Sequence, residues 1–297
     1  MFHFQQSKIG VFALILAALI FSTSNGASAD NAKASAVFNS PDILILGDSQ
    51  IPFGAGPRFL DFFENLVDNC GFKSKISDKL GARSVAVIGV RSSSLGTWTK
   101  RTKSGKRPIC AVDPKWKVNA GAYGTVNQSD NIYVQIGKGD NYQFCAPNKS
   151  AFETMFQPEY YDPKLLFLTF LGNSSATWAK DRNAALSDVK AAMAHLPKHI
   201  PCVFMTTAPT FRKNTVNQRL KAQGNLKSAF VETGNRCAFV DGFTSETIKS
   251  NLGVRRHFRQ RKSGKVKDPF HPNKRAAIKF FRLRHAAICD AIATQLK

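Results

Sequence analysis

Short apolar runs that alternate with helical segments constrain the fold of this chain most strongly. The runs of strand length are 42–46, 84–88, 165–171, 202–207 and 237–240. The segments with helical spacing of apolar residues are 57–69, 181–196, 213–232 and 273–295. Uninterrupted apolar runs are typical of strands buried on both faces, and strands that alternate with helices favour a parallel sheet covered on both sides. We therefore expect an α/β fold.

One segment departs from this alternation. Residues 96–160 are rich in Gly, Asn, Lys and Thr and contain one clear strand pattern, at 131–136. We expect a β-rich insertion there, within a single domain over 30–297 whose first residues, 30–40, form a polar linker.

The N-terminus has the grammar of a secretory signal peptide. Lys8 precedes the apolar run 9–21, and Ala27-Ser28-Ala29 offers a small-residue cleavage site. We expect residues 1–29 to be removed and the mature protein to be periplasmic or secreted. An uncleaved anchor is the alternative, but the run is short for a membrane span and no second long apolar run follows. No transmembrane segment is expected after cleavage.

Cysteine usage agrees with export. The chain holds six cysteines, an even number that favours disulfides in an oxidising compartment. Proximity in the sequence favours Cys110–Cys145 and Cys202–Cys237, which leaves Cys70–Cys289, although the sequence alone does not select a pairing. No Cys-x-x-Cys and no Cys/His pair has zinc spacing, so we expect no metal and no cofactor.

Polar residues follow three of the predicted strands, at 47–50, 89–92 and 172–175. The carboxyl ends of parallel strands meet at one edge of a sheet, where ligands bind. Ser49 would be exposed at that edge, but a serine hydroxyl needs a base to act as a nucleophile. The late Asp268-Pro-Phe-His271 supplies one: His271 would take the proton and Asp268 would orient the ring. The pattern predicts a Ser-His-Asp triad.

These motifs, in their order, resemble a known family. Gly47-Asp48-Ser49 after the first strand, Gly89 after the second, Gly172-Asn173 after the third and the late Asp-x-x-His resemble the four blocks of the SGNH (GDSL-type) hydrolase family, exported bacterial type. The resemblance covers residues 42–297 apart from the insertion. It implies a flavodoxin-like, three-layer α/β/α fold and metal-free ester hydrolysis through an acyl-enzyme.

The resemblance also assigns roles to single residues. Ser49 becomes the nucleophile, His271 the base and Asp268 its orienting partner. The backbone N–H groups of Ser49 and Gly89 and the side chain of Asn173 would form the oxyanion hole. A helix cap is the alternative for Ser49, and a turn residue is the alternative for Asn173.

The chain departs from the family pattern in two blocks. Gln50 stands where Leu is usual, which we expect to alter packing only. The third block normally has the form Gly-x-Asn-Asp, whereas here Gly and Asn are adjacent. Near the same edge, Arg91, Trp98 and Trp178 are candidate substrate contacts; a solvated loop for Arg91 and core packing for the two tryptophans are the alternatives.

Charge indicates the class of partner. Lys and Arg number 42 against 20 Asp and Glu, a net charge of +22. The densest basic stretch, 255–284, brackets Asp268 and His271. A solvated face is the usual meaning of such a stretch, but a focused positive field would also concentrate an anionic substrate. Export favours an anionic polysaccharide or envelope polymer, and the few interleaved aromatics do not indicate nucleic acid.

We therefore expect an exported serine esterase that removes O-acyl groups, in particular acetyl, from an envelope or extracellular polysaccharide. Three alternatives remain open at this point: a lipase, lysophospholipase or thioesterase; a sugar O-acyltransferase; and a catalytically inactive basic polysaccharide-binding module, which the altered third block favours.

Overall fold

The computed structural model describes residues 40–80, 84–90, 92–101, 149–156 and 161–297, together with the backbone of 120–124 and 134–136. The described residues do not include the predicted signal segment, most of the expected linker, Arg91 or the expected pair Cys110–Cys145. Predictions that concern them stay predictions.

The core of the molecule is a mostly parallel sheet. Its strand order is β4-β3-β2-β1-β5-β6-β7. The strands are β1 Ile43–Gly47, β2 Val85–Val90, β3 Ala120–Gly124, β4 Val134–Ile136, β5 Leu165–Thr169, β6 Cys202–Met205 and β7 Ala238–Val240. β2-β1-β5-β6-β7 are parallel, and β3 and β4 continue the sheet as antiparallel strands. This parallel order is the flavodoxin-like one, with its switch point between β1 and β5.

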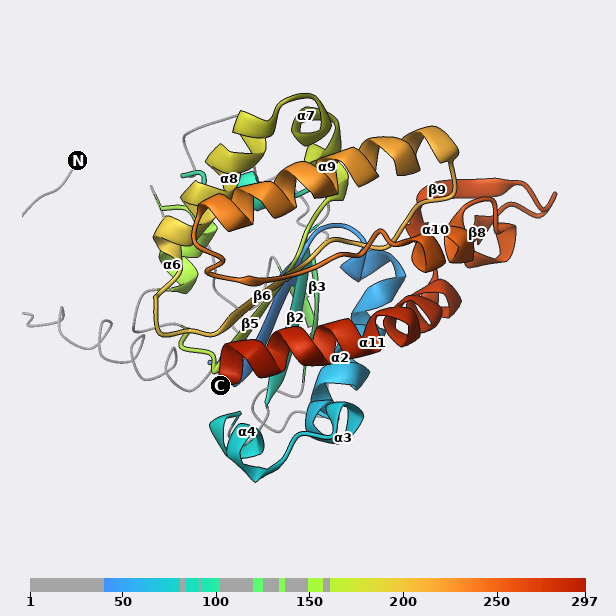
Figure 1. Cartoon of the computed structure of the whole chain (residues 1–297). Coiled ribbons are helices and arrows are strands. Elements are labelled where there is room, and N and C mark those ends of the chain that lie inside the picture. Colours follow the sequence, from blue (N-terminus) through green and yellow to red (C-terminus); the bar gives the residue numbers. More distant parts are fainter. Residues whose placement is uncertain are drawn as a thin grey trace, which may run out of the picture.

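Helices cover both faces of the sheet (Figure 1). Side chains alternate between the faces of a strand, so Leu44 and Leu46 enter one core cluster while Ile43 and Ile45 enter the other. The first face carries α5 Leu95–Trp98, α6 Ala151–Met155, α7 Ser175–Lys180, α8 Arg182–His195 and α9 Lys213–Glu232. The second carries α2 Gly56–Glu64, α3 Leu66–Cys70, α4 Ser74–Lys79 and α11 Lys274–Leu296. The expected three-layer α/β/α architecture is confirmed.

The segment 96–160 contributes to both sheet and core. Where it is described, β3 pairs with β2 and β4 pairs with β3. Phe152 and Met155 of α6 are fully buried in the first core cluster. The sequence predicted a strand that contains β4 but no strand at β3, because Ala-Gly-Ala-Tyr-Gly has no β-branched residue.

Two disulfides tie distant parts of the described chain together. Cys70–Cys289 links the end of α3 to α11, and Cys202–Cys237 links the first residue of β6 to the residue before β7. Cys202–Cys237 is a pair that proximity in the sequence favoured, and Cys70–Cys289 is the pair that this choice left over. They are compatible with an oxidising, extracytoplasmic compartment. Among the described helices, none combines the length and the apolar character that crossing a membrane requires.

A small antiparallel hairpin lies outside the main sheet. β8 Phe258–Gln260 and β9 Val266–Pro272 form it, and it projects beside α10 Ser245–Asn251 at one end of the molecule (Figure 1). The sequence patterns did not predict this hairpin. Asp268 and His271 both lie on β9.

Candidate active site

Ser49 lies on a tight turn that leaves β1 and enters a single π-helical turn, Ile51–Ala55, before α2. This turn folds back over the sheet, so the Ile51 side chain covers the ends of β1 and β2. A Cβ on Gly89 would lie 2.4 Å from the Ile51 Cβ, and one on Gly47 would lie 2.6 Å from its Cδ1. Glycine at both strand ends lets the turn approach closely. Ser49 is thereby held at the carboxyl edge of the sheet, beside the switch point.

The hairpin brings its histidine to this serine. His271 Nε2 lies 2.9 Å from Ser49 Oγ, and His271 Nδ1 lies 2.7 Å from Asp268 Oδ2. A carboxylate only accepts hydrogen bonds, so Nδ1 carries the proton and Nε2 is free to accept one from Ser49. The Phe53 ring stacks on the imidazole, with 4.2 Å between ring centroids. The structure thus brings together the three residues that the sequence selected, across 222 positions.

Asp268 is held as a carboxylate. Burial alone would raise its pKa, but the N–H groups of Phe270 and His271, the His271 side chain and its charge together bring the pKa below the usual value. The two backbone bonds, 3.0 and 3.2 Å, both go to Oδ1, which leaves Oδ2 for the imidazole. An ionised Asp268 can orient Nδ1–H and stabilise an imidazolium.

A second carboxylate, Asp48, supports the turn 48–50, which we call the nucleophile turn after the role that the sequence predicts for Ser49. Asp48 is 1% exposed; its Oδ1 accepts the N–H of Gln50, and its Oδ2 accepts those of Leu171 and Gly172. It therefore fastens the turn after β1 to the loop after β5. The guanidinium of Arg219 on α9 is also buried; burial lowers its pKa, and the negative charge of Asp48 opposes that shift.

The predicted oxyanion donors lie around the place where the turn after β1 meets the loop after β5. Asn173 follows the loop residues held by Asp48, and its Nδ2 donates to the Ser93 carbonyl at 2.7 Å. Gly89 lies inside β2, in register with Gly47 and Gly121, so the structure gives this glycine a packing role; its role as an oxyanion donor stays a prediction. Ser92, just beyond β2, has φ 63°. Such strain in a non-glycine residue is often found at functional sites.

Comparisons with known proteins find distant structural similarity only. No family model and no curated protein matches this chain. Among solved structures it is similar to a DUF4886 family protein from Bacteroides uniformis, with 10% identity, a TM-score of 0.41 and 83% of each chain covered. It is also similar to a proposed platelet activating factor from Streptococcus pneumonia, with 12% identity, a TM-score of 0.32 and 86% and 92% of the two chains covered. At these scores, any functional proposal depends on the site itself.

Gln50 does more than pack, and here the expectation from the sequence was wrong. Its Nε2 donates to the carbonyls of Ala208, at 3.0 Å, and Phe270, at 3.3 Å, while its Oε1 accepts the Ala208 N–H at 3.0 Å. Phe270 lies between Asp268 and His271 on β9. One side chain of the nucleophile turn therefore binds both the strand that carries the base and the loop on which that strand rests. No local pattern indicates contacts 158 and 220 residues away.

The two predicted aromatic contacts must be corrected. Trp98 and Trp178 are both 0% exposed and belong to the first core cluster, so neither offers a platform to a substrate. Each indole N–H has a partner inside: Ser93 Oγ at 3.3 Å for Trp98 and Asp188 Oδ2 at 2.9 Å for Trp178. A tryptophan whose N–H is satisfied can be fully buried. Among the described aromatics, the exposed one beside the site is Phe270, with 41% of its surface accessible.

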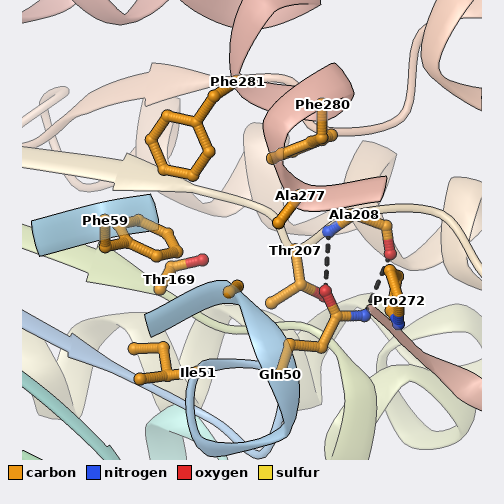
Figure 2. A pocket seen from close by; sticks show the side chains of 11 residues that line it. Gln50, Ile51, Phe59, Thr169, Thr207, Ala208, Pro272, Ala277, Phe280 and Phe281 are labelled. Atoms are coloured by element: carbon orange, nitrogen blue, oxygen red, sulfur yellow. Dashed lines mark hydrogen bonds between the residues drawn. The ribbon is translucent and has the colours of Figure 1, made fainter. Parts of the chain in front are cut away.

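A small cavity lies behind the triad, between the sheet and α11 (Figure 2). Gln50 and Pro272 border it on the side of the site, and Phe59, Phe280 and Phe281 supply much of its apolar wall. Its volume of about 10 Å³ suits one water molecule. It is too small for an acyl chain. Among the described residues, no group of His, Cys, Asp and Glu could hold a metal ion.

Proposed function

We propose that this protein is an exported serine esterase that removes short O-acyl groups, in particular acetyl, from an envelope or extracellular polysaccharide. The observation that carries the proposal is the chain of contacts from Asp268 through His271 to Ser49, at 2.7 and 2.9 Å. A nucleophile, a base within hydrogen-bond reach and a group that orients the base are the geometric requirements of nucleophilic acyl transfer.

The reaction follows from these contacts. His271 Nε2 takes the proton of Ser49 as Oγ attacks the ester carbonyl, and Asp268 stabilises the imidazolium. The oxyanion would be met by the N–H of Ser49, by the second N–H of the Asn173 amide and, as the sequence predicts, by the N–H of Gly89. His271 then protonates the leaving alcohol. Water, deprotonated by the same Nε2, attacks the acyl-Ser49 ester and releases the acid.

Two observations support a short acyl group on an extracytoplasmic substrate. The cavity described behind the triad holds about one water molecule, so this cavity offers no room for a lipid chain. The two disulfides suit an exported enzyme. A lipase or thioesterase would need an apolar channel that leads to Ser49.

Chromogenic esters of increasing acyl length test this proposal. We expect hydrolysis of the acetyl ester, slower hydrolysis as the chain lengthens, and a loss of at least about 10³-fold in kcat/KM for Ser49→Ala. Ser187→Ala, which changes an exposed serine on α8, serves as the matched control and should keep wild-type activity.

Other outcomes would redirect the proposal. Equal rates for wild type and Ser49→Ala would exclude Ser49 as nucleophile. A preference for long acyl chains would replace the esterase by a lipase, and acylated sugar in place of free acetate would indicate a transferase. Release of acetate from isolated polysaccharides, compared with Ser49→Ala, then identifies the natural ester.

A further inference from the structure

The hairpin that carries the base is strongly cationic. Seven exposed cations lie on it or at its base: Arg255, Arg256, Arg259, Arg261, Lys262, Lys265 and Lys267. The only acid between 255 and 272 is Asp268, and both of its oxygens are occupied by bonds within β9. None of the ion pairs of the described residues includes any of the seven. Within the described part of the chain, these charges face solvent without an acidic partner.

This positive field extends inward to the base of the hairpin. His257 precedes β8 and is 2% exposed. Its pKa lies below the ordinary value, first because of burial and further because of the positive charges of Lys279, Arg256 and Arg275. The cations of α11 therefore add to those of the hairpin on the same side of the molecule.

We propose that the hairpin, Phe258–Pro272 with Arg255 and Arg256 at its base, is a docking arm for a polyanionic glycan that carries carboxylate or phosphate groups. The inference rests on the proposed function, because β9 continues from these cations to Asp268 and His271. A polymer held along the arm would present its acyl groups to Ser49. Like-signed charge around a site raises the local concentration of an oppositely charged substrate.

The side chains of the hairpin favour a glycan over the other polyanions. Binding in a lipid interface needs large apolar residues next to the cations, but between Arg259 and Lys267 the only apolar side chain is Val266, which is half-buried. Single-stranded nucleic acid needs a series of exposed aromatics, but Phe258 is 2% exposed. Phe270 remains exposed beside His271, and one aromatic face at the catalytic end suits a sugar ring.

Binding measured without turnover tests the arm separately from the chemistry. All proteins carry Ser49→Ala, and affinity for polygalacturonate is compared with affinity for neutral dextran by titration calorimetry at low and high salt. The hairpin variant is Arg259→Gln, Arg261→Gln and Lys262→Gln. The matched control removes the same number of exposed cations elsewhere, with Lys190→Gln, Lys198→Gln and Lys221→Gln.

We expect the affinity for polygalacturonate to weaken as the salt concentration rises. The hairpin variant should lose about tenfold or more in affinity, and the control should lose clearly less. No binding to dextran is expected. Melting temperatures verify folding. If the triple variant does not fold, Lys262→Gln with Lys265→Gln at the tip replaces it, and a loss larger than that from Lys190→Gln with Lys198→Gln is expected.

Several results would overturn the proposal. Equal losses in the hairpin variant and the control would assign binding to diffuse charge, and salt-insensitive binding would exclude electrostatic docking. Tighter binding to phosphatidylglycerol vesicles or to a single-stranded oligonucleotide would assign the arm to another partner. If wild type hydrolyses no ester while the hairpin still binds polygalacturonate selectively, only the proposed function fails.

Discussion

The nucleophile turn, 48–50, and the hairpin, 258–272, meet at one candidate site but are built in opposite ways. The turn is buried: Asp48, Ser49 and Gln50 are 1%, 9% and 6% exposed, and the turn continues directly from the central strand β1. The hairpin is exposed, cationic and outside the main sheet. It rests on the loop after β6, where the Phe211 N–H donates to the Pro269 carbonyl at 2.9 Å. Changes in the turn should therefore lower the stability of the fold. Changes at the contacts that hold the hairpin in place should lower the catalytic rate.

The largest effect on the turn side is expected from Asp48→Asn. The amide replaces one carboxylate oxygen by an NH2 donor, so backbone N–H groups that donate to Asp48 lose an acceptor. Buried Arg219 also loses its counter-charge. Removing one partner of buried opposite charges costs about 3–5 kcal/mol. Denaturant unfolding measures the loss. Asp61→Asn, at an exposed aspartate, is the matched control and should stay within about 0.5 kcal/mol of wild type. An equally small change for Asp48→Asn would show that the charges do not support the turn.

On the hairpin side, Gln50→Leu separates positioning from stability. Leucine fills a similar volume but makes none of the hydrogen bonds to Ala208 and Phe270, so His271 is held less firmly against Ser49. We expect kcat to fall about tenfold or more with KM little changed, because misplacement of a catalytic group acts on the chemical step. Unfolding stability should fall by about 1–3 kcal/mol, the cost of unsatisfied buried groups.

Gln50→Glu is the second arm of that experiment. It keeps one acceptor oxygen in the place of Oε1 but replaces the NH2 group by a second acceptor oxygen. The Ala208 N–H therefore remains satisfied, while the bonds to the carbonyls of Ala208 and Phe270 are lost. If the link to β9 matters, Gln50→Glu should be impaired in kcat as Gln50→Leu is. An unchanged kcat in both variants, with stability lowered, would reduce Gln50 to a structural role.

The same contrast explains what the sequence could predict. Apolar runs and helical spacing placed β1, α8 and α9 almost to the residue, because burial on the sheet faces dictates these patterns. The hairpin was missed because Arg259–Lys267 has no alternation of apolar and polar residues; tertiary contacts hold it. The triad residues were selected from motifs, but Trp98 and Trp178 were misplaced at the edge. Both tryptophans lie on short helices, α5 and α7, and helices of four to six residues are too short to show an apolar period. The link made by Gln50 leaves no local signal either.

The smallest effect concerns the pH dependence at the base of the hairpin. His257 is buried, its Nδ1 lies 3.1 Å from Asn251 Oδ1, and its pKa is below the ordinary 6.5. Between its folded and unfolded pKa values the unfolded chain binds more protons, so this contribution to stability is full above pH 6.5 and is lost as the pH falls below it. We expect hydrogen exchange of residues 257–272 to accelerate between pH 7.5 and 5.5, after correction for the intrinsic rates. The His257→Gln variant should be less stable at neutral pH, and its hydrogen exchange should change less between pH 7.5 and 5.5. The control His195→Gln, on α8, should keep the pH dependence of the wild type. If hydrogen exchange in His257→Gln depends on pH as steeply as in the wild type, the titrating group is not His257.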